Sequence, residues 1–253
     1  MLNQFSRTEL LYGKAALENL ATMKIAVFGL GGVGGYTVEA LARAGIGKLD
    51  IIDDDKVCLT NINRQIYALR TTIGRYKVDV AKERIAQINP DCKVNAKKIF
   101  YTPQTASEFD FSQYDYIVDA IDTVTAKIDL AVQAQINNTP IISAMGAGNK
   151  KNPLLFEVSD IYDTSVCPLA KVMRKELKKR QVKKLKVVYS KEKPVVPIEN
   201  TDNSCKMHCI CPPGTIRKCT QKRQIPSSNS FIPPIVGFII AGEIINELVN
   251  KNF

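Results

Sequence analysis

Residues 24–35, KIAVFGLGGVGG, constrain the fold more than any other stretch, because an apolar strand runs directly into a glycine-rich turn. The turn has Gly29, Gly31 and Gly34 at G-x-G-x-x-G spacing, with Gly32 between them, and a helical run follows. In such a turn the first glycine lets the chain reverse tightly, the second lets backbone N–H groups approach a phosphate, and the third lets the helix pack on the strand. The stretch therefore predicts an anion-binding site at the amino end of a helix.

The glycine spacing alone also occurs in ordinary structural turns, so its context decides the interpretation. A second apolar strand, LDIID at 49–53, ends in Asp53. This arrangement is typical of nucleotide-binding βαβ units, in which an acidic residue at this place holds a ribose. We therefore predict a nucleotide site built from the four glycines and Asp53.

Strand and helix patterns alternate as far as residue 143, and the pattern changes past Met145. Such alternation predicts an α/β fold with a doubly wound, Rossmann-like, mostly parallel sheet, helices on both of its faces, and sites at the carboxyl ends of its strands. The predicted strands are 25–28, 49–53, 93–99, 116–120, 140–143 and 154–160, and the helices between them are 33–44, 77–89 and 125–137. We also predict an amphipathic helix at 8–21, a basic helix at 168–180, an irregular insertion at 189–231, and a C-terminal helix at 231–249 that packs back on the sheet.

The positive charge of the chain is concentrated in one segment. Residues 171–223 carry 16 Lys and Arg against 4 Asp and Glu, whereas residues 1–170 carry 18 against 19. Such a block is expected for a polyanionic partner, although a solvated helix face or a flexible basic loop has the same composition. We divide the chain into a nucleotide-binding domain at 1–160 and a basic, cysteine-containing, substrate-side extension at 161–253, and we expect the two to form one compact unit.

Hydropathy and cysteine usage favour a cytoplasmic protein without stable membrane insertion. The first ten residues contain no apolar run of the kind found in signal peptides, and the apolar run at 233–242 is too short to span a bilayer. In such a protein the seven cysteines are expected as thiols or metal ligands rather than disulfides.

Four of the cysteines cluster in the predicted insertion, beside His208. A closed tetrahedral metal site is one interpretation of this cluster. Their spacing, C-x3-C-x-C-x7-C, is not a standard zinc pattern, so reduced loop cysteines or a redox-labile pair remain alternatives. The four residues are Cys205, Cys209, Cys211 and Cys219.

Further polar residues follow successive predicted strands. Asn61 and Arg64 come after Asp53, Lys77 opens the next helix, and Asp122 follows the strand at 116–120. A carboxylate for Mg²⁺ and cations for phosphates suit nucleotidyl transfer, because charge builds on the α-phosphate and on the leaving pyrophosphate. Simpler interpretations are a surface ion pair for Arg64, a solvated helix start for Lys77 and a helix N-cap for Asp122.

The segments GLGGVGG, LARAGIGKLDIIDDDKVCLTNINRQ, GRYKV, RIAQINP and DAIDTVTAK together resemble the ubiquitin-activating-enzyme-like adenylating family, of the ThiF, MoeB and HesA type. The resemblance implies that residues 1–160 form an ATP-binding adenylating domain in which Asp53 holds the ATP ribose. It also implies that Asp122 binds Mg²⁺, and that Arg7, in the motif FSR, enters the ATP site of the neighbouring subunit of a homodimer. By the same resemblance the catalytic residues are Arg64, Lys77, Asp122 and Arg7, the phosphates are held by Asn61, Arg64 and Lys77, and the nucleotide site comprises Gly29, Gly31, Gly32, Gly34, Asp53, Asp55, Asn61, Arg64, Lys77 and Asp122.

Within this family, CPLAKVMRKELKK at 167–179 and IPSSNSFIPPIVGFIIAGEII at 225–245 resemble the tRNA threonylcarbamoyladenosine dehydratase branch. That branch uses ATP to adenylate the threonine carboxylate of a modified adenosine in tRNA, and a ring then closes with loss of AMP. A tRNA substrate also explains the segregated basic block.

Three alternatives stay open. The first is an enzyme that activates the C-terminus of a ubiquitin-like sulfur carrier, although this chain has no C-x-x-C pair of the kind often found there. The second is an NAD-dependent oxidoreductase, since NAD sites share the glycine signature. The third is a non-catalytic RNA-binding protein. The sequence indicates neither a monovalent cation nor a sulfur-transfer partner.

Overall fold

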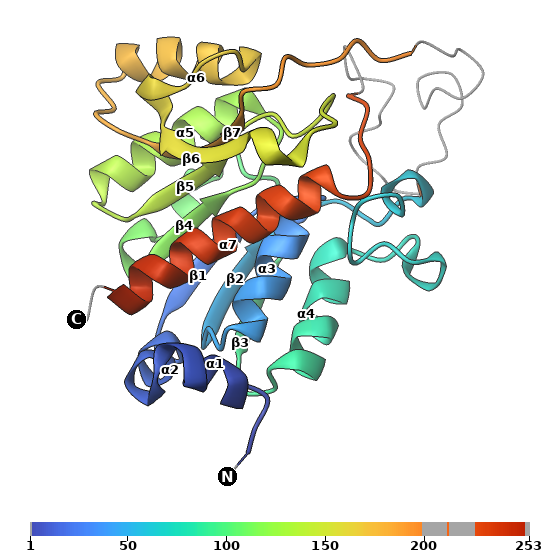
Figure 1. The fold of residues 1–253 in the computed structure, drawn as a ribbon, viewed down its shortest axis with the longest axis vertical. Coiled ribbons are helices and arrows are strands. Elements are labelled where there is room, and N and C mark those ends of the chain that lie inside the picture. Colours follow the sequence, from blue (N-terminus) through green and yellow to red (C-terminus); the bar gives the residue numbers. More distant parts are fainter. Residues whose placement is uncertain (1, 199–211, 213–225, 251–253) are drawn as a thin grey trace.

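The computed structural model describes residues 2–198, 212 and 226–250, and these form a seven-stranded sheet with helices on both faces (Figure 1). The strand order is β3-β2-β1-β4-β5-β7-β6, and all neighbouring strands are parallel except β6 and β7. The predicted doubly wound α/β fold is confirmed. The strands are β1 (Lys24–Phe28), β2 (Lys48–Ile52), β3 (Lys93–Lys97), β4 (Tyr116–Asp119), β5 (Ile141–Ala144), β6 (Phe156–Asp160) and β7 (Lys186–Ser190).

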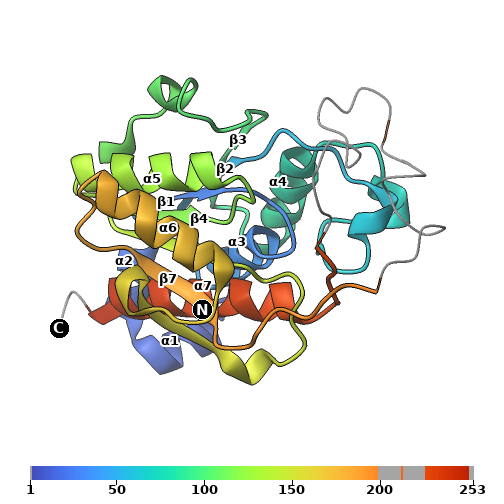
Figure 2. The same cartoon turned by 90° about the horizontal axis from the view of Figure 1, so that it is seen from above.

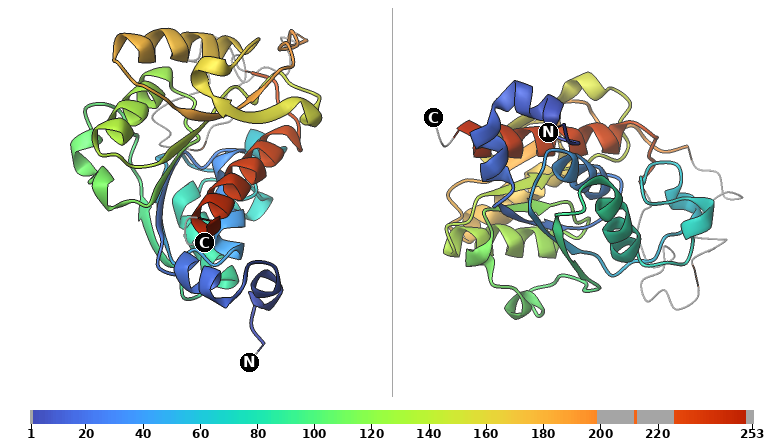
Figure 3. Two further views of the ribbon diagram at one scale, coloured as in Figure 1. Left: turned by 60° about the vertical axis from the view of Figure 1, so that its left-hand side comes forward. Right: turned by 90° about the horizontal axis from the view of Figure 1, so that it is seen from below.

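The helices divide between the two faces of the sheet (Figure 3). Ile25 and Val27 of β1 pack into an apolar cluster with helices on one face, whereas Ala26 and Phe28 point to the other face. This alternation follows from the two-residue period of a strand, so both faces of the central strand are buried. One face carries α3 (Gly34–Arg43), α4 (Lys77–Ile88) and α7 (Ile232–Asn250), and the other carries α5 (Val124–Ile136) and α6 (Pro168–Lys179).

Short 3₁₀ turns occupy many of the connections between these elements. Those before β4 place Phe109 and Phe111 against Phe28 and Tyr101, with ring centroids 4.9 to 6.2 Å apart. The connection between β3 and β4 therefore contributes to a packed aromatic cluster. The turns are η1 (Leu59–Asn61), η2 (Arg70–Thr72), η3 (Ala106–Glu108), η4 (Phe111–Gln113), η5 (Pro153–Leu155) and η6 (Ile161–Asp163).

The single helix predicted over 8–21 is wrong. The segment forms two short helices, α1 (Ser6–Tyr12) and α2 (Lys14–Leu20), separated by Gly13 with φ of +84° and ψ of 163°. These angles lie outside the helical region, and glycine adopts them at little steric cost. The break leaves Leu10 89% exposed and Leu11 74% exposed, whereas Leu20 is buried.

Strand β7 was not predicted. The strand lies between β5 and β6, and four of its five residues are buried. Its sequence, KVVYS, therefore lacks the alternation of apolar and polar residues that marks a half-buried strand. Through β7, residues beyond 160 belong to the same sheet as the nucleotide-binding half.

Helix α7 is long and apolar enough to cross a membrane by length and composition alone, with a mean hydropathy of 1.6. In the structure it lies along α3 and also contacts α2, β5 and β7 (Figure 1 and Figure 2). Gly237 allows this approach, because a Cβ there would lie 2.5 Å from the carbonyl oxygen of Val33. The predicted C-terminal helix that packs back on the sheet is therefore confirmed, and its arrangement is that of a core helix.

A buried carboxylate joins α3 to α4. Arg84 of α4 donates two hydrogen bonds of 2.8 Å to the two oxygens of Glu39, and Arg43 donates to the same carboxylate at 2.7 and 2.9 Å. The Glu39 side chain is only 6% exposed. Burial alone would raise the pKa of Glu39, but the hydrogen bonds from Arg84 and Arg43 outweigh it and hold the pKa below the ordinary value.

We expect Glu39→Gln to lower the free energy of unfolding by about 2 kcal/mol at pH 7, because two charge-assisted pairings lose their carboxylate. A carboxyl whose pKa is lowered in the folded state adds stability above its unfolded pKa of about 4.3 and loses it as the pH falls through the folded value. The deficit of the variant should therefore shrink below about pH 4. Urea unfolding at pH 7 and at acidic pH measures both quantities.

Glu18→Gln is the matched control, since Glu18 and Lys14 are 68% and 77% exposed and lie 3.7 Å apart. It should change stability little at either pH. An equal deficit for Glu39→Gln at both pH values would contradict the assignment.

Candidate active site

The glycine-rich turn joins β1 to α3 through backbone contacts that leave no room for a side chain at Gly29 or Gly34. Gly29 has φ of +92°, and a Cβ there would lie 2.7 Å from the carbonyl oxygen of Ala120, beyond the end of β4. A Cβ on Gly34 would lie 1.8 Å from the carbonyl oxygen of Gly29. Gly31 differs, since nothing lies within 4 Å of the place where its Cβ would be. Tight reversal and close packing therefore explain Gly29 and Gly34, while Gly31 faces open space.

Asp53 follows β2 and is hydrogen-bonded to the start of this turn. One carboxylate oxygen accepts the backbone N–H of Leu30 at 2.7 Å, and the other accepts that of Asp55 at 2.8 Å. Burial raises the pKa of the Asp53 carboxyl, while Lys77 and the two N–H groups oppose the rise. The carboxylate is thus fixed beside the glycine-rich turn, where a ribose was predicted.

Lys77 is buried, which contradicts its interpretation as a solvated helix start. Only 4% of the residue is exposed, and its Nζ lies 2.8 Å from Asp55 Oδ2 and 3.8 Å from Asp53 Oδ1. Burial alone would lower the pKa of Lys77, but attraction to Asp53, Asp55 and Asp122 outweighs it and raises the pKa. The ammonium group therefore stays charged at the carboxyl edge of the sheet, within a group of carboxylates.

Asp122 lies in the loop between β4 and α5. The N-cap position of α5 is Thr123 rather than Asp122, so the N-cap interpretation is wrong. Asp122 follows the carboxyl end of β4, and its charge helps to raise the pKa of Lys77, so it shares this edge with Asp53 and Asp55. Since carboxylate oxygens are the ligands that Mg²⁺ prefers, this group of side chains can hold a divalent ion when a nucleotide supplies further oxygens.

Arg64 borders the turn from the loop that follows β2. Its Cγ lies 3.3 Å from the place where a Cβ on Gly32 would be, and its guanidinium donates to the carbonyl oxygen of Thr60 and to Asn63. Asn61 has a structural task, because its side-chain oxygen accepts the backbone N–H of Cys58 at 3.0 Å and closes a 3₁₀ turn. Arg64 is therefore placed near the glycines, and Asn61 shapes the loop that carries it.

Arg7 is not part of this group within one protomer. It is exposed on α1, where the neighbouring Phe5 packs against Gly45 at the carboxyl end of α3. The glycine-rich turn lies at the other end of α3, about 15 Å away along a ten-residue helix. Arg7 can thus enter a site of this kind only on another subunit.

The chain that enters α7 also borders the candidate site, and no pattern in the sequence predicted this. Asn63 donates a 3.2 Å hydrogen bond to the carbonyl oxygen of Ser228, while Asn149 Oδ1 accepts from the N–H of Ser227 at 2.7 Å. Pro233 continues along this edge, 2.9 Å from the place where a Cβ on Gly32 would be. Residues 226–233 therefore connect the loops that follow β2 and β5.

Two predictions on cysteines have different outcomes. Cys92 and Cys167 are free thiols, as expected for the part of the chain that the structure describes. The predicted metal cluster of Cys205, Cys209, Cys211 and Cys219 lies outside the described residues and stays a prediction.

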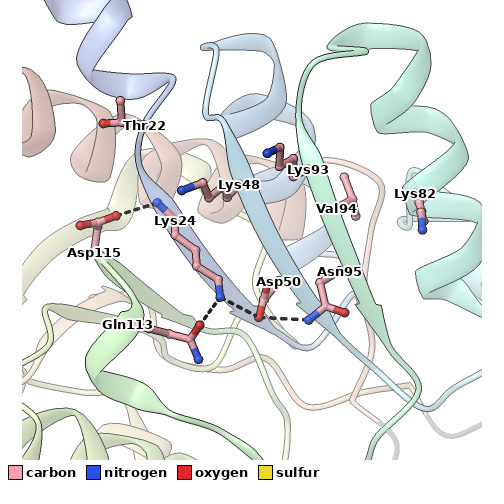
Figure 4. A pocket seen from close by; sticks show the side chains of 10 residues that line it. All are labelled: Thr22, Lys24, Lys48, Asp50, Lys82, Lys93, Val94, Asn95, Gln113 and Asp115. Atoms are coloured by element: carbon pink, nitrogen blue, oxygen red, sulfur yellow. Dashed lines mark hydrogen bonds and ion pairs between the residues drawn. The ribbon is translucent and has the colours of Figure 1, made fainter.

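A hollow of about 820 Å³ opens at the opposite edge of the sheet, at the amino ends of the strands. Figure 4 shows Lys24 reaching across it toward Gln113 and Asp50, with Lys48 and Lys93 on neighbouring strands. None of the predicted site residues lines this hollow. Its volume alone therefore does not identify the active site, which we place at the carboxyl edge on its chemistry.

Comparison with known proteins supports the predicted family. The model of the ThiF family matches residues 5–252. The chain belongs to the ThiF family. This ThiF-family protein is 43% identical over 250 residues to the tRNA threonylcarbamoyladenosine dehydratase of Bacillus subtilis (strain 168), with 98% of this chain and 96% of the relative covered. It is 31% identical over 131 residues, 52% of this chain, to the sulfur carrier protein ThiS adenylyltransferase of Escherichia coli (strain K12).

Solved structures extend the similarity to the whole fold. The E. coli tRNA N6-threonylcarbamoyladenosine dehydratase in complex with AMP superposes with a TM-score of 0.84 at 33% identity, covering 98% of this chain and 95% of that one. The same enzyme in complex with ATP gives a TM-score of 0.82 with the same coverage. The predicted family and branch are therefore confirmed for this ThiF-family protein.

We expect Gly31→Ala to leave the melting temperature unchanged, because a methyl group there meets open space. The same variant should weaken ATP binding about tenfold or more, because the methyl group keeps a phosphate from the backbone. Differential scanning fluorimetry and calorimetric titration with ATP separate the two effects. Gly34→Ala is the contrasting variant, since its methyl group would overlap the Gly29 carbonyl, and it should destabilise the fold itself. If Gly31→Ala binds ATP as tightly as the wild type does, the phosphates do not approach the backbone at Gly31.

Proposed function

We propose that the protein catalyses the ATP-dependent dehydration of N6-threonylcarbamoyladenosine in tRNA. The observation that carries the proposal is the extent of the similarity, which reaches 98% of this chain and 96% of the Bacillus subtilis dehydratase. The similarity to the ThiS adenylyltransferase stops at 52% of this chain. The basic extension is thus shared with enzymes named for a tRNA substrate, which favours a tRNA over a sulfur-carrier protein.

The chemistry proceeds in two balanced steps. The threonine carboxylate attacks the α-phosphate of ATP, the bond to the β-phosphate breaks, and pyrophosphate leaves. The carbamoyl group of the same nucleoside then attacks the activated carbonyl carbon, AMP leaves with the former carboxylate oxygen, and a ring closes with loss of one proton. The net change in the nucleoside is the loss of one water. Because ring closure is intramolecular, the protein needs to hold the adenylate in place and needs no external nucleophile.

The residues at the carboxyl edge have matching tasks in this proposal. The open backbone at Gly31 would receive the phosphates, and Asp53 would accept a hydrogen bond from the ATP ribose. Arg64 and Lys77 would stabilise the charge that develops on the leaving pyrophosphate. Asp122 would hold Mg²⁺, which when bound neutralises phosphate charge and orients the α-phosphate.

We propose that tRNA binds to a surface formed by the basic helix α6 and by the residues that directly follow it. Ala170, Met173 and Leu177 bury one side of α6, so its lysines lie on the outside. Exposed lysines on a helix bind phosphodiesters through charge and counterion release rather than by sequence. The exposed cations of this surface are Lys171, Lys175, Lys178, Lys179, Arg180, Lys183 and Lys184.

A homodimer completes the proposed site with Arg7 from the neighbouring subunit. Helices α1 and α7 are joined by a 3.4 Å hydrogen bond between Tyr12 and Asn246, and both expose large apolar side chains. Leu10 and Leu11 are 89% and 74% exposed, and Phe238 is 50% exposed. A second copy would cover this apolar surface and could bring Arg7 to the partner's site. A cytoplasmic location agrees with a tRNA substrate and stays a prediction.

The direct test uses tRNA that carries N6-threonylcarbamoyladenosine, incubated with the protein, ATP and Mg²⁺. Mass spectrometry of nucleosides prepared under mild conditions should show the loss of one water, together with one AMP per converted nucleoside. We expect Arg64→Ala to reduce turnover at least 100-fold with an unchanged melting temperature, on the order of the effect of removing one transition-state donor. Lys77→Ala is a poorer probe, because it leaves the buried Asp53 without its cation.

An unchanged nucleoside would overturn the proposed function. Pyrophosphate exchange that depends on a carrier protein's C-terminal glycine and ignores tRNA would instead support the sulfur-carrier alternative.

We expect the combined replacement of Lys178, Lys179, Lys183 and Lys184 by Gln to weaken tRNA binding and to flatten its salt dependence, because fewer counterions are released. Filter binding at several salt concentrations gives the slope, and ATP affinity serves as the control because these lysines lie away from the glycine-rich turn. If the variant and the wild type show the same salt dependence of tRNA binding, the basic residues of this surface form only a solvated face.

A further inference from the structure

The backbone of Ile121, the residue before Asp122, is held on both sides by one ion pair. Asp119 Oδ1 accepts the N–H of Ile121 at 3.2 Å, and Lys127 Nζ donates to the carbonyl oxygen of Ile121 at 3.2 Å. Lys127 Nζ also lies 3.0 Å from Asp119 Oδ2. The two charged residues come from the end of β4 and from the first turns of α5, so the pair spans the loop that carries Asp122.

This ion pair is fully buried, with both side chains at 0% exposure. Burying two charges costs several kcal/mol per ion, and well-packed apolar residues often stabilise a fold as well or better. A gain in stability is therefore a weak explanation for the pair. Its hydrogen bonds to the Ile121 peptide groups point instead to control of the loop conformation.

Neighbouring strands hold the same loop from its other sides. Ser143 of β5 donates a 2.5 Å hydrogen bond to Asp119 Oδ2, which fixes the carboxylate against the sheet. The N–H of Ala120 donates to the carbonyl oxygen of Phe28 at 2.9 Å, next to Gly29 of the glycine-rich turn. Hydrogen bonds thus connect the loop and the end of β4 to β1, β5 and α5, and these contacts fix the position of the Asp122 backbone.

We propose that Asp119 and Lys127 are positioning residues, which fix the Ile121 backbone and thereby place the Asp122 carboxylate for Mg²⁺ bound to ATP. This inference rests on the proposed function, in which Asp122 is the Mg²⁺ ligand. Neither residue touches the nucleotide; both act through the loop. Partners of a metal ligand typically change metal affinity 10-fold to 100-fold when they are removed.

The test compares the wild type with Asp119→Asn/Lys127→Met, which removes both charges at nearly constant volume and avoids an unpaired buried ion. The first measurement is amide hydrogen exchange of residues 118–124 without nucleotide. The second is the calorimetric affinity for ATP with Mg²⁺ and with EDTA. We expect faster exchange in this loop, unchanged affinity for metal-free ATP, and a loss of about tenfold or more in the enhancement by Mg²⁺.

Lys186→Met is the matched control, because it removes a lysine from another ion pair, at 2.8 Å from Glu243 of α7. It should leave both the loop exchange and the Mg²⁺ enhancement unchanged. A folded double variant with wild-type exchange and wild-type Mg²⁺ enhancement would overturn the inference while the proposed function stands. A wild-type protein whose ATP affinity ignores Mg²⁺ would count against Asp122 as a ligand, and thus against the metal step of the proposed function as well.

Discussion

The site depends on backbone packing without side chains at the junction of β1, α3 and the loop after β4. Gly34 lies against the carbonyl group of Gly29, and Gly29 lies against that of Ala120, at distances that a Cβ could not occupy. Because three chain segments meet so closely, the carboxyl ends of β1, β2 and β4 form one narrow edge. Asp53 and Asp122 are placed on this edge by the strands that precede them, and a phosphate can approach the backbone between them.

Charged side chains occur in two different settings in this molecule. At the carboxyl edge, Lys77 and Asp53 are buried and held by specific partners, which favours a small nucleotide in a defined orientation. On α6 the lysines are exposed on long, flexible side chains. Such a surface suits a large polyanion whose affinity falls with salt. Under the proposed function, this separation would let tRNA contact and nucleotide chemistry vary independently.

The sequence allowed the prediction of the mostly parallel sheet and of most helix boundaries. The glycine spacing and the apolar strands report local backbone needs, and these are visible in single residues. The break at Gly13 was missed because an apolar pattern continues across it, and β7 was missed because a strand buried on both faces lacks alternation. The burial of Lys77 and the ion pair of Asp119 with Lys127 depend on which segments meet in space. A lysine between Ala126 and Ile128, on a buried helix face, was the one local sign of that pair.

The place of β7 has a consequence for how the chain acquires its structure. Among the described strands, β6 pairs only with β7, and β7 is what joins it to β5. During synthesis, residues 156–160 therefore have no strand partner until residues 186–190 have emerged from the ribosome. The parallel half of the sheet can assemble earlier, since its partners are already present in the first 144 residues. Folding should thus proceed in two stages, and the basic helix α6 is made between the two strands that pair last.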